Sequence, residues 1–197
     1  MRAVTEAAPR AAGRGDGIDA RTLWAATFAH FLNDFFVAFL APLLPLVVSR
    51  FNLSLALAGL LATVLTTSAA MSQPLFGAIA DRLRRRIFVV TGPALTVAAM
   101  GLIGLAPTYT ILILLLLLAG TGTSSFHPQG ASTAGEASGR RKGAGLSLFV
   151  AGGELGYALG PLTIAVVVAA RGLEATWMVA LPGLAAAIFL WRWIPPR

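Results

Sequence analysis

The sequence has no cysteine and few charged side chains. Without a thiol, disulfide bonds and thiolate metal sites are excluded. Only 12% of the 197 residues are charged, about half the share found in soluble proteins. Neither 51–80 nor 87–135 contains an Asp, Glu, Lys or Arg. Because a hydrocarbon core ~30 Å thick needs ~20 apolar residues per helical crossing, these uncharged runs predict an all-α membrane protein.

Two further observations narrow the function. His30 and His127 are the two histidines, and they lie far apart in the sequence, which is not a zinc-ligand spacing. We therefore expect no metal site and no cofactor. The net charge is +7, but the basic residues form short blocks between apolar segments instead of covering one soluble face. This distribution predicts that the chain lies in a lipid bilayer and does not bind nucleic acid.

Hydrophobic residues make up 57% of the chain and give a mean hydropathy of +0.79. Residues 1–22 are polar and lack the apolar core of a signal peptide, so we expect a disordered cytoplasmic tail. Residues 23–194 are expected to form a six-helix transmembrane bundle, with Pro42 and Pro45 bending the far end of its first helix. The six expected spans are 23–48, 55–80, 87–106, 110–133, 143–170 and 177–191.

The basic residues also predict the orientation of the bundle. Of the 15 Lys and Arg residues, all except Arg50 and Arg171 lie in the tail, in the second and fourth loops, or at the C-terminus. Positively charged loops stay in the cytoplasm. We therefore expect a multi-pass protein of the inner or plasma membrane with both termini cytoplasmic.

The end of the second span carries a specific loop pattern. A small residue is followed four positions later by an acid and then by a basic turn. This resembles the loop signature of the major facilitator superfamily, although Arg84 stands where that family prefers glycine. The resemblance implies that the acid is a conformational latch. The residues of the pattern are Gly77, Asp81, Arg82, Arg85 and Arg86.

The fifth span carries a stripe of glycines. Gly152, Gly156 and Gly160 recur every four residues and are followed by Pro161, which resembles the antiporter motif in the fifth helix of the same superfamily. Glycines at this spacing form a smooth face that another helix backbone can approach closely. We refer to Gly152, Gly156 and Gly160 as the glycine stripe.

The most specific resemblance is to the fosmidomycin-resistance branch of that superfamily. It rests on His-Phe-Leu-Asn-Asp at 30–34, Pro-Leu-Leu-Pro at 42–45, the run 120–128 ending in Phe-His-Pro, and the run 147–153. It implies a twelve-helix exporter built from two six-helix halves, of which this chain matches the first. Family members usually carry an arginine in the fourth helix, but 111–118 is entirely aliphatic here. An arginine-based proton relay is therefore not expected.

Polar ionisable residues inside the spans are the candidate site. A charge near the bilayer centre costs at least ~2.5–3.5 kcal/mol, so its presence suggests function. Asp34 lies near the middle of the first span, with His30 one turn earlier and Asn33 beside it. Glu154 lies at a similar depth in the fifth span, and we expect it to face the same cavity. His127 either lines that cavity or caps the backbone that the following proline loosens, while a structural hydrogen bond is the alternative for Asp34.

These features predict a secondary transporter, and specifically a proton-coupled exporter of a small molecule that works by alternating access. Uptake of a sugar-like or organic-anion solute is one alternative, and a non-transporting membrane subunit is another. An enzyme is not expected, because no nucleophile with an oriented base is evident. A second six-helix half is expected as a partner, either from a second copy of the chain or from a missing C-terminal half, facing the glycine stripe and the cavity.

Overall fold

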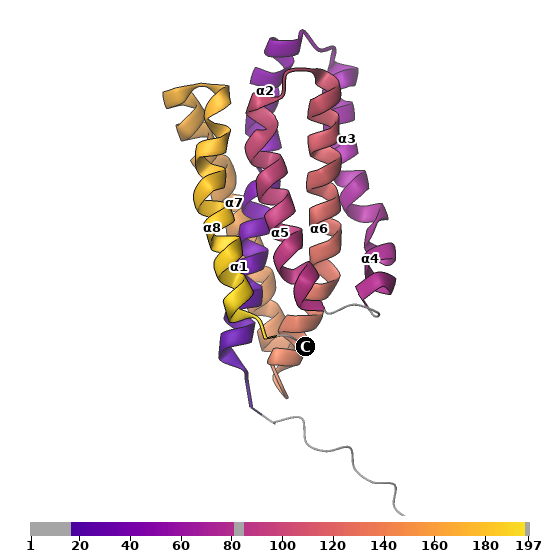
Figure 1. The fold of residues 1–197 in the computed structure, drawn as a ribbon, viewed down its shortest axis with the longest axis vertical. Coiled ribbons are helices and arrows are strands. Elements are labelled where there is room, and N and C mark those ends of the chain that lie inside the picture. Colours follow the sequence, from indigo (N-terminus) through magenta and orange to yellow (C-terminus); the bar gives the residue numbers. More distant parts are fainter. Residues whose placement is uncertain (1–16, 81–84, 196–197) are drawn as a thin grey trace, which may run out of the picture.

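The computed structural model of the chain describes residues 17–80 and 85–195, and every regular element in these ranges is helical. The helices run side by side along the long axis of the molecule, and α1 begins at the same end of the bundle at which α8 ends (Figure 1). In chain order the elements are α1 (Ala20–Val37), α2 (Leu40–Phe51), α3 (Leu55–Met71), α4 (Gln73–Ala80), α5 (Arg85–Leu102), the 3-10 turn η1 (Ile103–Leu105), α6 (Tyr109–Ala137), α7 (Lys142–Arg171), the 3-10 turn η2 (Leu173–Ala175) and α8 (Thr176–Trp193).

Six helical segments of the described chain are long and apolar enough to cross a membrane, which confirms the expected fold class. The second matches the expected span, and the others differ from expectation by a few residues at their ends. α1 begins at Ala20, before the expected boundary at residue 23, because the Asp19 carboxylate caps it by accepting a hydrogen bond from the Thr22 amide. The six segments are Ala20–Phe51, Leu55–Ala80, Arg86–Leu105, Tyr109–Ala137, Lys142–Arg171 and Leu173–Trp193.

The first and second spans are each built from two helices. α1 ends at Val37 and α2 begins at Leu40. The break falls four residues before Pro42, where the proline ring clashes with the carbonyl of Ala38 and no amide is available to bond it. The expected bend therefore occurs, but one turn before the proline that causes it. In the second span, α3 and α4 meet at Ser72.

The glycine stripe packs inside this bundle. An added Cβ would overlap the carbonyl oxygen of Phe31 at Gly156 and the carbonyl oxygen of Phe35 at Gly160, so the backbones of α7 and α1 are in direct contact. α1 packs more extensively against α7 than against any other described element. The expectation that the stripe faces a second half is therefore wrong, because its partner is α1 of the same chain.

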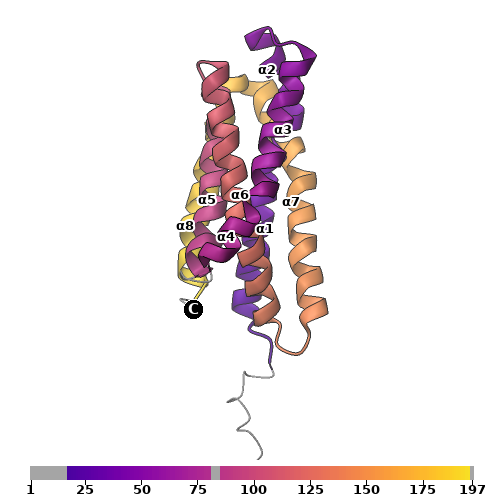
Figure 2. The ribbon, with the colours of Figure 1, turned by 90° about the vertical axis from the view of Figure 1, so that its right-hand side faces the viewer.

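α1 occupies a central position that brings it against four spans. It contacts α5, α6, α7 and α8, and Figure 2 shows it beside α6 and α7. The outward faces of the bundle carry large apolar side chains, such as Leu55 at 89% and Ile188 at 72% exposure. An apolar exterior around a partly polar centre is the arrangement expected in lipid. Polar residues on the inward faces of α1, α5 and α6 therefore meet at the centre of the bundle.

Candidate functional site

A carboxylate between two imidazoles lies at the centre of the candidate site. His30 Nε2 lies 3.1 Å from Asp34 Oδ2, one turn away on α1. His127 Nε2, from α6, lies 3.2 Å from Asp34 Oδ1. Each carboxylate oxygen thus faces one imidazole nitrogen. We call these three side chains with Asn33 the His–Asp cluster.

Asn33 fixes the position of the carboxylate. Its amide nitrogen donates to Asp34 Oδ1 at 2.9 Å, and its amide oxygen accepts from the hydroxyl of Thr96 at 3.0 Å and from that of Thr123 at 3.4 Å. Because both hydroxyls donate to the oxygen, the amide nitrogen is the atom that faces the carboxylate. Asn33 and Thr96 are fully buried. The cluster is therefore tied to α5 and α6 through one buried amide.

His30 is held rigidly from α7. Its Nδ1 lies 2.8 Å from the carbonyl oxygen of Phe149, and its ring stacks on the Phe149 ring with centroids 4.2 Å apart. Gly153 leaves space for the imidazole, since an added Cβ there would lie 2.5 Å from the ring. These contacts leave His30 one orientation, with Nε2 directed at Asp34.

The hydrogen bonds determine where a proton must sit. A carbonyl oxygen only accepts, so His30 Nδ1 carries the hydrogen of its bond to Phe149. The 3.1 Å contact between His30 Nε2 and Asp34 Oδ2 then needs one further proton, because two lone pairs would otherwise face each other. His127 can donate from Nε2 to Asp34 Oδ1 as a neutral imidazole. With the shared proton present, the cluster is neutral; without it, the cluster carries one negative charge.

The cluster is accessible from one side. The exposed fractions of the side chains are 11% for His30, 18% for Asp34 and 33% for His127. His127 lies in the turn of α6 before Pro128, and its ring meets the His30 ring edge-on at a centroid distance of 5.1 Å. Asp34 and His127 therefore retain some exposed surface, whereas His30 is more enclosed and stacks on Phe149.

The donor atoms of His30, Asp34 and His127 lie within 4.8 Å of one another, a spacing that ligands of a metal ion also show. The sequence analysis expected no metal site, because the two histidines lie far apart in the sequence. The direct nitrogen–oxygen distances of 3.1 and 3.2 Å are hydrogen-bond distances. At these distances, a proton can be shared between the Asp34 carboxylate and either imidazole.

Other expected site residues lie apart from the cluster. Glu154 is exposed on α7, and the structure gives it no hydrogen bond or ion pair among the described residues. Gly77 lies in α4 with open space where its side chain would be. Asp81 and Arg82 lie outside the described residues, as does the side chain of Arg85. The fold therefore brings together four of the expected site residues, which are His30, Asn33 and Asp34 on α1 and His127 on α6.

Sequence reasoning missed three supports of the cluster. Thr96 and Thr123 resemble many other hydroxyl residues of membrane helices, which commonly bond their own backbone. The Phe149 carbonyl carries no sequence signal, because every residue has a backbone carbonyl and only the packing of α7 on α1 brings this one to His30. The available clue was the run 147–153, in which a phenylalanine precedes two glycines.

Six apolar helical segments around an ionisable cluster define a multi-pass membrane protein. The Major Facilitator Superfamily profile matches residues 26–197. The chain therefore belongs to the Major Facilitator Superfamily, as its loop and fifth-helix motifs indicated.

Two curated relatives place the chain within this family. The fosmidomycin resistance protein of Escherichia coli (strain K12) is 32% identical over 169 residues, which cover 85% of this chain and 41% of that protein. An uncharacterized transporter of the same superfamily from Bacillus subtilis (strain 168), YfnC, is 28% identical over 173 residues, which cover 85% of this chain and 42% of that protein. The chain spans about two fifths of the length of these relatives. The resemblance to the fosmidomycin-resistance branch is thereby confirmed.

Proposed function

We propose that the chain forms the proton-coupling half of a secondary transporter that exports a small molecule by alternating access. The observation that carries this proposal is the 3.1 Å distance between His30 Nε2 and Asp34 Oδ2, which suits a shared proton. Asp34 takes the principal proton, and Glu154 contributes to substrate or proton handling when the second half is present. The glycine stripe of α7 packs on α1, so movement of the bundle during alternating access is coupled to the helix that carries Asp34.

The two charge states of the cluster supply the coupling. The loaded cluster is neutral, and it crosses between inward- and outward-open states without moving a charge through the low dielectric. The empty cluster carries one negative charge and costs several kcal/mol to enclose. The transporter therefore changes between its inward- and outward-open states when the cluster holds a proton, or when a bound substrate supplies the positive charge of that proton. This requirement is the physical basis of coupled transport.

Export is proposed over uptake because the E. coli relative is named for resistance to an antibiotic. Uptake of an organic solute uses the same cluster in the opposite direction. The third candidate is a non-transporting membrane subunit, which has no need for a proton-holding centre. None of these readings is enzymatic, since no nucleophile accompanies the imidazoles.

A complete transporter needs a second six-helix half. Halves of this superfamily are related by an axis along the membrane normal. An even number of spans returns the chain to its starting side, so two copies can pair in this parallel relation. The partner is therefore either a second copy of this chain or a following C-terminal half. Light scattering of the solubilised protein tests the first possibility. A mass of two copies supports pairing of the chain with itself, and a mass of one copy with full transport activity contradicts both possibilities.

Reconstituted vesicles test the transport proposal. The protein is placed in proteoliposomes with an imposed proton gradient, and movement of candidate compounds is followed together with internal pH. A panel of resistance phenotypes on overexpression, beginning with fosmidomycin, selects the compound. Compound-dependent proton movement supports the proposal. A panel in which compounds move with no change in internal pH contradicts proton coupling, and a chain that moves none of them fits the subunit reading.

A further inference from the structure

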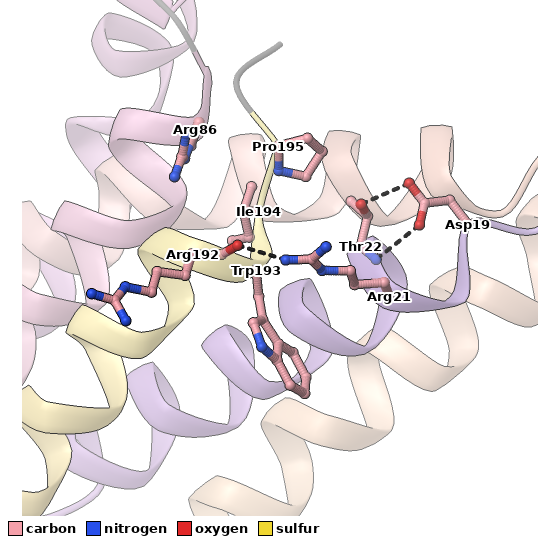
Figure 3. Close-up of a pocket in the computed structure, with 8 residues that line it drawn as sticks. All are labelled: Asp19, Arg21, Thr22, Arg86, Arg192, Trp193, Ile194 and Pro195. Atoms are coloured by element: carbon pink, nitrogen blue, oxygen red, sulfur yellow. Dashed lines mark hydrogen bonds between the residues drawn. The ribbon is translucent and has the colours of Figure 1, made fainter.

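A basic pocket opens at the end of the bundle where α1 begins and α8 ends. Its volume is about 470 Å³. Figure 3 shows Arg86 of α5 and Arg21 of α1 on opposite sides of the segment that follows α8. The pocket is lined by Asp19, Arg21, Thr22, Arg86, Arg192, Trp193, Ile194 and Pro195.

Three arginines and one acidic residue line this pocket. Arg192 presents its backbone carbonyl to Arg21, and its guanidinium points away from Arg21 (Figure 3). The carboxylate of Asp19 is engaged as the cap of α1, accepting from the amide and the hydroxyl of Thr22. Arg21 donates from one Nη to the carbonyl oxygen of Arg192 at 2.7 Å and retains its other N–H groups. The lining therefore has a net charge of +2 and free donors. An anion is the ligand that such a lining favours.

Arg86 adds an unsatisfied donor to the pocket. Its Nε atom is buried and has no hydrogen-bond partner among the described residues, although buried polar atoms are almost always paired. Its guanidinium lies over the ring of Trp191, 4.5 Å from the centroid, which holds it in place. A pre-positioned guanidinium with an unpaired donor is arranged for an oxygen-rich anion.

An apolar groove continues from this pocket along the bundle. It has a volume of about 680 Å³ and shares Trp193 with the basic pocket. On α1, Trp24 and Phe28 follow Arg21 at successive turns, so the groove runs from the charged end toward the middle of the span. The groove is lined by Trp24, Phe28, Ala185, Ala186, Phe189, Leu190 and Trp193.

We propose that the basic pocket and the apolar groove together bind one anionic phospholipid of the cytoplasmic leaflet. The phosphate lies in the basic pocket, which both Arg21 and Arg86 line, and one acyl chain lies in the groove between α1 and α8. A soluble phosphate accounts for the arginines but leaves the groove empty, whereas a phospholipid fills both. Trp193 stands at the junction, at the interfacial depth that tryptophan favours. Basic pockets between membrane helices on the cytoplasmic side bind anionic headgroups in this way.

The net charge selects among phospholipids. A phosphatidylcholine headgroup brings a cation together with its phosphate, and the +2 lining repels that cation. A phosphatidylglycerol headgroup brings the phosphate alone. The site is independent of the proton-coupling proposal, because it lies at the end of the bundle and shares no residue with the His–Asp cluster.

Quenching of tryptophan fluorescence tests the site directly. The full chain in detergent is titrated with phosphatidylglycerol or phosphatidylcholine whose acyl chains carry bromine, which quenches an indole that it touches. Two of the 4 tryptophans, Trp24 and Trp193, line the groove. We expect phosphatidylglycerol to quench at lower concentration than phosphatidylcholine, and a W24F/W193F variant to lose that difference.

Arginine variants assign the headgroup contact. R21Q/R86Q is expected to weaken phosphatidylglycerol binding about fivefold for each charge removed. R140Q/K142Q, which removes two charges just before and at the first residue of α7, serves as the matched control. Folding of each variant is checked by thermal unfolding. Equal quenching by the two lipids, or equal losses in the two double variants, overturns the proposal. Stabilisation by inorganic phosphate without any lipid preference assigns the pocket to a soluble anion and overturns it as well.

Discussion

At the residue scale, the geometry around Asp34 separates two kinds of proton. The hydrogen that His30 donates to the Phe149 carbonyl is structural, since that 2.8 Å bond is buried and has no alternative donor. The proposal assigns the exchangeable proton to the contact between His30 and Asp34, where the carboxylate retains 18% exposure. Because Phe149 holds His30 rigidly, Nε2 has a defined position for the proton that we propose it shares with Asp34.

Thr96 is the residue whose loss should disturb the cluster without touching its titratable groups. T96V removes the 3.0 Å bond to the Asn33 oxygen and leaves that buried acceptor with the longer Thr123 contact. A buried polar atom left unsatisfied costs about 1–3 kcal/mol. We expect a lower thermal midpoint in detergent and severalfold slower proton-driven flux.

T91V is the matched control for this prediction. Thr91 lies on the same helix, is exposed, and its hydroxyl bonds the backbone carbonyl of Ile87. Its loss should leave both measurements near the parent values. Equal effects of T96V and T91V would show that Asn33 does not need its hydroxyl support.

The sequence was informative where the contacts are local. Three residues of the cluster lie about one helical turn apart or less on α1, namely His30, Asn33 and Asp34. Helical geometry alone therefore placed them together. Glu154 was placed with them because it lies at a similar depth, but depth does not fix the direction a side chain faces. The Thr96 contact depends on how α5 and α1 are rotated against each other, which no single helix encodes.

At the element scale, the contact between α1 and α7 fixes the position of the site. The absence of side chains at Gly156 and Gly160 lets α7 approach closely enough for its Phe149 carbonyl to reach His30. The sequence predicted a close-packing face from the glycine spacing. It did not predict the partner, because small-residue faces pack equally well within a bundle and between two bundles.

Gly156 should therefore be intolerant of even a methyl group. In G156A the added Cβ overlaps the Phe31 carbonyl oxygen, and overpacking of this kind costs about 1–3 kcal/mol. We expect a lower midpoint of thermal unfolding, measured by intrinsic tryptophan fluorescence. Flux should also fall, because the Phe149 carbonyl moves away from His30.

G143A on the same helix is the control, because nothing lies within 4 Å of the added Cβ there. Alanine favours a helix over glycine, so this variant should be at least as stable as the parent. A G156A protein as stable as G143A would contradict the close contact of α1 with α7.

At the scale of the whole molecule, the six spans place both ends of the described chain at one end of the bundle (Figure 1). The number of spans followed from the six apolar segments of the sequence, since each is long enough to cross a bilayer. Which end is cytoplasmic rests on the distribution of Lys and Arg. That orientation is open to direct measurement.

The lack of native cysteine makes a labelling experiment clean. Single cysteines at Ser54, before α3, and at Arg140, before α7, lie at opposite ends of the bundle. We expect a membrane-impermeant maleimide to label S54C in intact cells and R140C only after the membrane is opened. Labelling of both from outside would contradict the six-span topology, and labelling of R140C alone would reverse the orientation.

The most direct test of the account compares uphill transport with exchange in D34N. Asparagine has the size of aspartate but cannot take up the shared proton, so the variant should fold, retain exchange of the panel compound across proteoliposomes at equal concentrations, and lose its accumulation against a gradient. E174Q, which removes a carboxylate that is 61% exposed at the other end of the bundle, should accumulate the compound like the parent. Uphill accumulation by D34N at the parent rate would show that Asp34 is structural and that the coupling proton is held elsewhere.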